Sequence, residues 1–268
     1  MIKSFYGLTH NPFDKHHTSE KNFFQSRDFQ EMTARLDYIK NTRGIGVFTA
    51  PPGFGKTFTL RCFAKNLNPN LFRVAYICLT TVSVVDFYRQ FCAELHIEIS
   101  SKKSDMFRSI QEHLYTQFKE KRRPLLLVVD EAHELDPRIL KDIKMIMNHH
   151  FDSLNCFTLL LVGEPHLNHI LQKSIHEALR QRINIHYAFE GLSQQETADY
   201  ILHKISGAGG AVSMIADTIP NAVYGASQGN PRLVDNVMSD ALTIGAQLEK
   251  SVIDTDTILA AVNNLALI

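Results

Sequence analysis

The sequence has no long hydrophobic run. Its 268 residues contain no stretch of 18 or more apolar residues, and the opening MIKSFYGLTH lacks the apolar core of a signal peptide. We therefore expect a cytoplasmic protein that does not cross a membrane. With 44% hydrophobic residues, a chain of this length can bury one or two cores, so we expect one or two domains.

Closely spaced cysteine pairs are also missing. The four cysteines lie far apart in the sequence, which favours buried thiols over disulfides or zinc ligands. The thirteen histidines suggest a metal site, but no set of thiolates or carboxylates completes one near the clusters His149-His150 and His166-x-x-His169. Packed or solvated histidines are the simpler interpretation.

The chain has no net charge, but its charges are unevenly distributed. Residues 192–268 contain three basic and eight acidic residues, so the first 191 residues carry a net charge of +5. The basic excess is concentrated between Lys102 and Arg123. This pattern is compatible with a local nucleic-acid patch and equally with an ordinary solvated helix face.

The octet APPGFGKT, residues 50–57, predicts a phosphate-binding loop. It differs from Gly-x-x-x-x-Gly-Lys-Thr only at Ala50, where a small residue suffices, and it lies between an apolar run and a helical pattern. Lys56 would reach the β and γ phosphates, and the Thr57 hydroxyl would hold Mg²⁺. The alternative is a glycine-proline turn without a ligand. The residues expected to bind the nucleotide here are Pro52, Gly53, Phe54, Gly55, Lys56, Thr57 and Phe58.

The segment LLLVVDEAHEL, residues 125–135, provides two acids at the end of an apolar strand. Ligands of parallel sheets bind at the carboxyl ends of the strands, so Asp130 can hold Mg²⁺ and Glu131 can orient and deprotonate the attacking water. The alternative is a capped helix start. Asp-Glu-Ala-His is also a helicase box, but such helicases need two α/β domains and this chain has room for one.

Apolar runs alternate with helical patterns up to residue 191, and helical patterns alone follow. This order predicts an α/β domain with a parallel sheet covered on both faces, over residues 1–191 with an N-terminal segment 1–28, and a helical lid domain over residues 192–268. The expected strands are 45–49, 72–79, 125–129, 157–162 and 183–187. The expected helices are 28–38, 57–65, 84–95, 106–119, 137–148, 194–205, 212–224, 232–245 and 255–263.

Five segments occur in order along the chain: APPGFGKT, LLLVVDEAH, FTLLLVGEP, ALRQRINIHYAF and QGNPRLVDNV. In order and spacing they resemble the AAA+ ATPases of the transposon target-selection type, the family of TnsC, TniB, MuB and the ExeA-like proteins. The opening FYGLTHNPF also resembles that of ExeA-like proteins, so the resemblance covers nearly the whole chain. It implies an AAA+ P-loop fold, an ATPase that uses ATP and Mg²⁺, and assembly on double-stranded DNA into rings or helical filaments that recruit a transposase.

The resemblance also implies roles for residues outside the loop. Arg182 matches the arginine finger that reaches a neighbouring subunit's γ-phosphate, with Arg180 as a second candidate, and Arg232 matches the sensor-2 arginine of the lid. Without the resemblance, the first two would be surface arginines at a helix end. Glu164 stands where a neutral polar sensor-1 residue is usual, and an acid there would repel the γ-phosphate. The residues that match the two Walker motifs are Lys56, Thr57, Asp130 and Glu131.

In this family, the loop after the second strand and the start of the following helical insertion face DNA. The corresponding segments here are TTVS and SSKKS, whose hydroxyls and lysines suit contacts to backbone phosphates. Ordinary polar loops are the alternative. No aromatic residues accompany them, which argues against stacking on single strands. The candidate DNA contacts are Thr80, Thr81, Ser83, Ser101, Lys102 and Lys103.

These observations favour an ATP-dependent regulator of DNA transposition that binds DNA, target-selection proteins and further copies of itself. The alternative is an ExeA-like secretion-assembly or chaperone-type ATPase that acts on protein. Secretion relatives carry a membrane span and further domains, which this sequence lacks, and this favours the DNA hypothesis. A third possibility, suggested by Glu164, is a switch that binds ATP tightly and hardly hydrolyses it.

Overall fold

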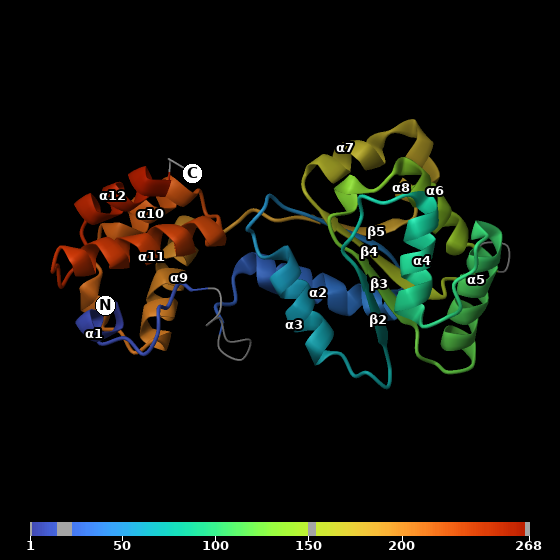
Figure 1. The fold of residues 1–268 in the computed structure, drawn as a ribbon, viewed down its shortest axis with the longest axis horizontal. Helices are drawn as coiled ribbons and strands as arrows, with labels where there is room; N and C mark the ends of the chain where they lie inside the picture. The colour runs from blue at the N-terminus through green and yellow to red at the C-terminus, as the bar shows by residue number, and fades with distance from the viewer. Residues whose placement is uncertain (1, 15–22, 150–153, 266–268) are drawn as a thin grey trace. The chain divides into compact units, whose positions relative to one another are not determined.

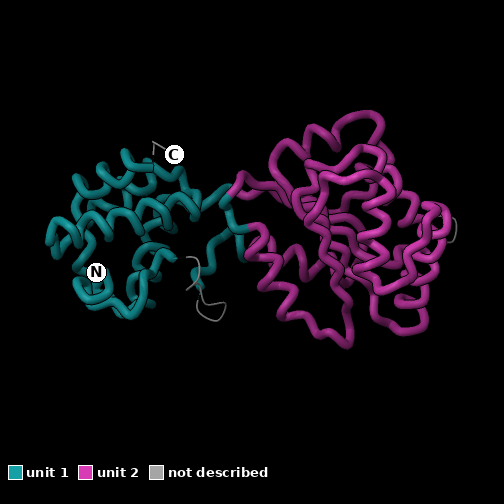
Figure 2. Tube along the Cα trace, viewed as in Figure 1, with its two compact units in different colours: residues 1–30, 53–55, 190–268 teal, residues 31–52, 56–189 magenta. Residues whose placement is uncertain are grey.

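The computed structural model describes residues 2–14, 23–149 and 154–265. The chain divides into two compact units, shown in different colours in Figure 2. One consists of residues 31–52 and 56–189, and we call it the α/β unit. The other consists of residues 1–30, 53–55 and 190–268, and we call it the helical unit.

The α/β unit contains a parallel sheet of five strands in the order β2-β3-β4-β1-β5. The predicted parallel sheet is therefore confirmed. The sheet's three central strands are buried along their whole length, because their sequences are largely apolar. The strands are β1 (Gly44–Thr49), β2 (Arg73–Ile77), β3 (Leu125–Val129), β4 (Phe157–Gly163) and β5 (Ile183–Ala188).

Helices cover both faces of the sheet, with α2 and α3 on one side and α4, α5 and α6 on the other (Figure 1). Ser83 caps the N-terminus of α4 through its side chain, and Asp136 caps α6, which explains where these helices begin. The helices are α2 (Arg27–Thr42), α3 (Lys56–Asn66), α4 (Val84–Leu95), α5 (Lys103–Lys119), α6 (Pro137–Ile146), α7 (His166–Gln172) and α8 (Glu177–Arg180), with 3₁₀ turns η2 (Ala132–Glu134) and η3 (Ser174–His176).

The helical unit combines both ends of the described chain. Residues 1–28 are predicted to belong to the nucleotide-binding domain, whereas the described residues among them, 2–14 and 23–28, group with residues 190–265. Leu8 and Phe13 are buried in the core of this unit, and the Tyr6 hydroxyl donates to the Lys250 carbonyl over 3.0 Å. Its helices are α1 (Ile2–Tyr6), α9 (Gln194–Gly207), α10 (Ile219–Ser227), α11 (Pro231–Gln247) and α12 (Thr255–Leu265), with a 3₁₀ turn η4 (Val212–Met214).

The continuous helix predicted over residues 212–224 is wrong. The chain forms η4, then extends so that Ile215 makes a parallel bridge with Ile253, and α10 begins only at Ile219. Pro220 sits in the first turn of α10, where its missing N–H costs nothing. None of the helices in the described ranges is long and apolar enough to span a bilayer.

Candidate nucleotide site

The predicted phosphate loop follows β1 directly. Ala50 is fully buried and its N–H donates to the Gly163 carbonyl over 3.1 Å, which explains the small residue at this position. Gly53 and Gly55 have φ values of 89° and 93°, a backbone conformation that side chains disfavour. Glycine at these two positions therefore allows the loop to adopt its positive φ values.

Lys56 begins α3 and is only 6% exposed. Its Nζ donates to the carbonyl oxygens of Ala50 over 2.6 Å and Pro51 over 3.2 Å. The ammonium group is thus held against the loop by oxygen acceptors. Phosphate oxygens are acceptors of the same kind with more negative charge, so this position suits phosphate binding.

Thr57 and Asp130 meet as the sequence motifs require. The Thr57 Oγ1 donates to Asp130 Oδ2 over 2.9 Å, and the same oxygen accepts from the Tyr76 hydroxyl over 2.7 Å. Asp130 Oδ1 accepts from the Glu131 N–H over 3.0 Å, and Asp130 is 3% exposed. Burial and the hydrogen bond to Asp130 raise the pKa of Tyr76, so its hydroxyl remains a donor at neutral pH.

The Thr57 hydroxyl and the Asp130 carboxylate fit Mg²⁺, which prefers oxygen ligands and is usually held by one or two protein groups together with substrate phosphates. When bound there, Mg²⁺ would neutralise charge on the phosphates. The two groups come from the start of α3 and the end of β3, so the fold itself brings them together.

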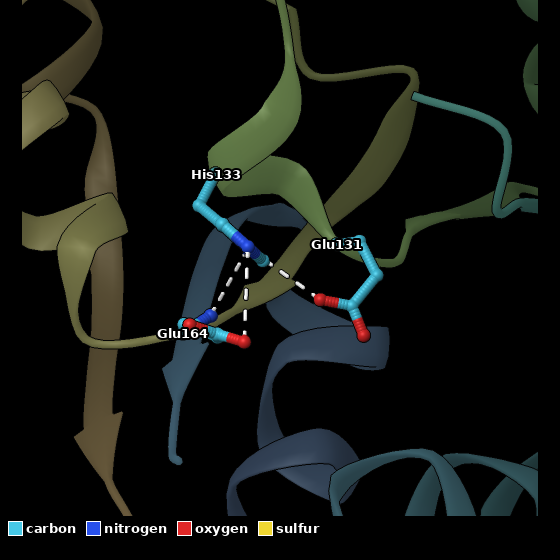
Figure 3. A group of neighbouring side chains, drawn as sticks. All are labelled: Glu131, His133 and Glu164. Atoms are coloured by element: carbon cyan, nitrogen blue, oxygen red, sulfur yellow. Dashed lines mark hydrogen bonds and ion pairs between the residues drawn. The ribbon is translucent and has the colours of Figure 1, made fainter. Parts of the chain in front are cut away.

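Glu131 adopts a left-handed conformation with φ of 51°, and its side chain is half exposed. This conformation is unusual for a residue other than glycine and turns the chain sharply after β3. The side chain lies beside His133 and Glu164, as Figure 3 shows. Glu131 Oε2 is 3.5 Å from His133 Nδ1, and Glu164 Oε1 is 4.0 Å from His133 Nε2.

Glu131, His133 and Glu164 form a group that sequence spacing did not reveal, because Glu164 lies on a different strand end. The Glu164 N–H donates to His133 Nδ1 over 3.2 Å, so Nδ1 carries no proton and the neutral ring is protonated at Nε2. A metal bound at Nε2 would require that proton to leave. The geometry therefore favours a hydrogen-bonded link between the β3 and β4 ends over a metal site at His133.

The arginines implied by the resemblance lie at element ends. Arg180 is exposed at the end of α8 and donates to the Gln172 carbonyl over 2.9 Å, while Arg182 is half-buried just before β5. Arg232 lies in the first turn of α11, in the helical unit. A Cβ added to Gly53, in the same unit, would lie 2.8 Å from the Arg232 Cβ, so the loop tip packs closely against this turn.

The candidate DNA contacts differ in their surroundings. Thr80 is buried, and the Ser83 hydroxyl is engaged as the cap of α4. Lys103 Nζ forms an ion pair with Asp142 at 2.5 Å. Of the six candidate DNA contacts, Thr80 is buried, which argues against direct contact between Thr80 and DNA. The exposed candidates are Thr81, Ser83, Ser101, Lys102 and Lys103.

Residues 39–171 match a family model described as "AAA domain". This segment is thus similar to AAA domains. It contains the phosphate loop, Asp130, Glu131 and Glu164. Among curated proteins, General secretion pathway protein A of Aeromonas hydrophila is 27% identical over 265 residues, which is 97% of this chain and 48% of the relative. The chain thus spans about half the length of that protein.

Solved structures show the same fold. Cdc6p from Pyrobaculum aerophilum matches with a TM-score of 0.66 and 16% identity, covering 90% of this chain and 67% of that one. A structure titled Drosophila ORC bound to DNA matches with a TM-score of 0.66 and 14% identity, covering 99% and 66%. The fold is therefore that of P-loop AAA+ ATPases, as predicted, and fold and family together support nucleotide hydrolysis in general.

Proposed function

We propose that this protein is a Mg²⁺-dependent ATPase that converts ATP to ADP and phosphate. The hydrogen bond between Thr57 and Asp130 carries the proposal, because it joins the two motifs at one end of the sheet. Lys56 binds phosphate there, and Glu131, next to Asp130, positions the attacking water. The remaining residues of the phosphate loop, together with Arg232 at the start of α11, complete nucleotide binding.

Two substitutions test this assignment. Lys56→Ala should abolish ATP binding, because the phosphates lose their main cationic partner, whereas Glu131→Gln should retain binding and hydrolyse ATP far more slowly. Fluorescent-nucleotide titration and phosphate release measure the two properties separately. Normal phosphate release by the Gln variant would exclude Glu131 as the residue that positions water.

We further propose that ATP-bound copies assemble on double-stranded DNA in the cytoplasm and recruit a transposase. The similarity to transposon ATPases suggests this role, and the exposed Thr81, Ser101 and Lys102 suit phosphate contacts. Arg182, with Arg180 as the alternative, would complete the nucleotide site of an adjacent copy. Because each copy contributes few phosphate contacts, a monomer should bind DNA weakly and an assembly strongly.

A second candidate is an ATPase that acts on protein in secretion. The match to General secretion pathway protein A over 97% of this chain favours it. The sequence argument against it, a missing membrane span, loses its force because the chain spans only about half of that relative. Both candidate functions require the same nucleotide site. They differ in whether the ATP-bound protein binds double-stranded DNA or another protein.

Duplex affinity measured with ATP and with ADP at several salt concentrations separates the candidates. A DNA-bound assembly predicts ATP-dependent binding that is indifferent to sequence and falls steeply with salt, with a slope of roughly −0.9 per phosphate neutralised. Lys102→Ala should flatten the slope without changing nucleotide affinity. Lys65→Ala, which removes a lysine from α3, is the matched control. Weak binding in both nucleotide states would favour the protein-directed candidate.

A further inference from the structure

Tyr76 belongs to neither sequence motif, yet it touches the acid on which Mg²⁺ binding depends. It lies on β2, the edge strand beside β3, in register with Val128, two residues before Asp130. Its hydroxyl reaches past the strand end and donates to Asp130 Oδ2 over 2.7 Å. The tyrosine is 38% exposed, but its hydrogen bond to the buried Asp130 is partly buried.

The hydrogen bonds around Asp130 show how Tyr76 can act without blocking a cation. A carboxylate offers about four lone-pair sites. Three are used, because Oδ2 accepts from Thr57 and Tyr76 and Oδ1 accepts from the Glu131 N–H. About one site remains for a water molecule bound to a cation. The three donors come from three different elements, α3, β2 and the turn after β3, so together they fix the plane of the carboxylate.

We propose that Tyr76 is a positioning residue for the magnesium site, holding the Asp130 carboxylate in the orientation that accepts Mg²⁺-bound water. The inference rests on the proposed ATPase function. Without the Tyr76 hydroxyl, each carboxylate oxygen would keep a single donor, the Thr57 hydroxyl on Oδ2 and the Glu131 N–H on Oδ1. The Tyr76 hydroxyl, which comes from β2, adds a second donor on Oδ2 and so restrains the orientation of the carboxylate further.

Binding of Mn²⁺ to the complex with ADP, followed by electron paramagnetic resonance, tests this role without hydrolysis. Tyr76→Phe removes only the hydroxyl and keeps the packed ring. We expect its Mn²⁺ affinity to fall roughly tenfold, the size typical of one hydrogen bond to a charged acceptor, while ADP affinity without metal is unchanged. Tyr38→Phe, at a tyrosine 60% exposed on α2, is the matched control and should behave as wild type.

Steady-state hydrolysis gives a second measurement. The Mg²⁺ concentration for half-maximal rate should rise by roughly tenfold in Tyr76→Phe, whereas kcat at saturating Mg²⁺ should remain near that of wild type. A loss of kcat that Mg²⁺ does not restore would overturn the proposal, as would an unchanged or tighter Mn²⁺ affinity. If the wild-type protein binds Mn²⁺ and ADP but releases no phosphate, the ATPase proposal fails and the role of Tyr76 is still decided by the resonance titration.

Discussion

His176 provides a sharp test of how burial sets stability in this fold. It is 1% exposed at the end of η3, and, among the residues that the structure describes, neither ring nitrogen has a hydrogen-bond partner. Leaving buried polar atoms unpaired generally costs about 1–3 kcal/mol. Replacement by leucine, which has a similar size and no polar atom, should therefore raise the free energy of unfolding at pH 7.5 by about 1–3 kcal/mol.

The advantage of the variant should grow as the pH falls. Burial, with Lys141 and Lys173 nearby, lowers the pKa of His176 below its ordinary value of 6.5. Below that value the unfolded chain binds a proton at this position and the folded chain does not, so the wild type loses stability by up to about 1.4 kcal/mol per pH unit. The difference stops widening below the lowered pKa, where both states are protonated. Leucine does not titrate, so the variant avoids this loss.

Urea unfolding followed by circular dichroism at pH 7.5, 6.5 and 5.5 measures both effects. Burial also lowers the pKa of His113, but His113 is present in both proteins, so its contribution cancels in the difference. His166→Leu, at an exposed histidine at the start of α7, should change stability little at any of these pH values. The reasoning is refuted if His176→Leu unfolds at lower urea than the wild type, or if the difference between them does not depend on pH.

Two further predictions concern the nucleotide site. Arg182→Ala should leave ATP binding by isolated subunits intact and suppress assembly-dependent hydrolysis by ~10³. Mixing this variant with Lys56→Ala should restore some phosphate release. If the two variants co-assemble and phosphate release does not recover at any mixing ratio, a shared site is excluded. Gly163→Ala would place a Cβ 3.1 Å from His133 Nδ1 and should displace the imidazole ring. We expect this variant to slow ATP hydrolysis more than it weakens ATP binding. Single-turnover assays measure the first property and binding titrations the second.

The parts of the fold that depend on local pattern could be predicted. The five apolar residues of β3 were assigned with their observed bounds, because a run of five buried aliphatic residues admits few alternatives. The two motifs likewise predicted that Thr57 and Asp130 would meet, since Asp130 directly follows β3 and Thr57 lies at the end of the loop that follows β1 in the same parallel sheet. The roles of Arg182 and Arg232 remain predictions, because they depend on ligands and neighbouring copies.

Tertiary contacts decided the features that could not be predicted. Tyr76 is one of several aromatic residues near strands, and its contact with Asp130 depends on the β2–β3 register. The break at Ile215 arises because the backbone pairs with Ile253, which lies in a distant part of the sequence. The sequence places Lys103 in a polar segment suited to phosphate contacts, whereas in the structure it pairs with Asp142 on α6. In each case, the deciding contact joins two residues that lie far apart in the sequence.

The N-terminal segment also has a consequence for biosynthesis. Leu8 and Phe13 belong to the same core as residues of α11 and α12, and Tyr6 pairs with Lys250, 244 positions later. At translation rates of roughly 5–20 residues per second, residues 2–13 leave the ribosome roughly 10 to 50 s before the helices that bury them. During that interval their apolar side chains have no permanent partner. The α/β unit has all its strands by residue 188 and can fold first, so a nascent chain that has exposed residue 188 but not α12 outside the ribosome should bind a holdase chaperone through residues 2–13 and lose that binding once α12 emerges.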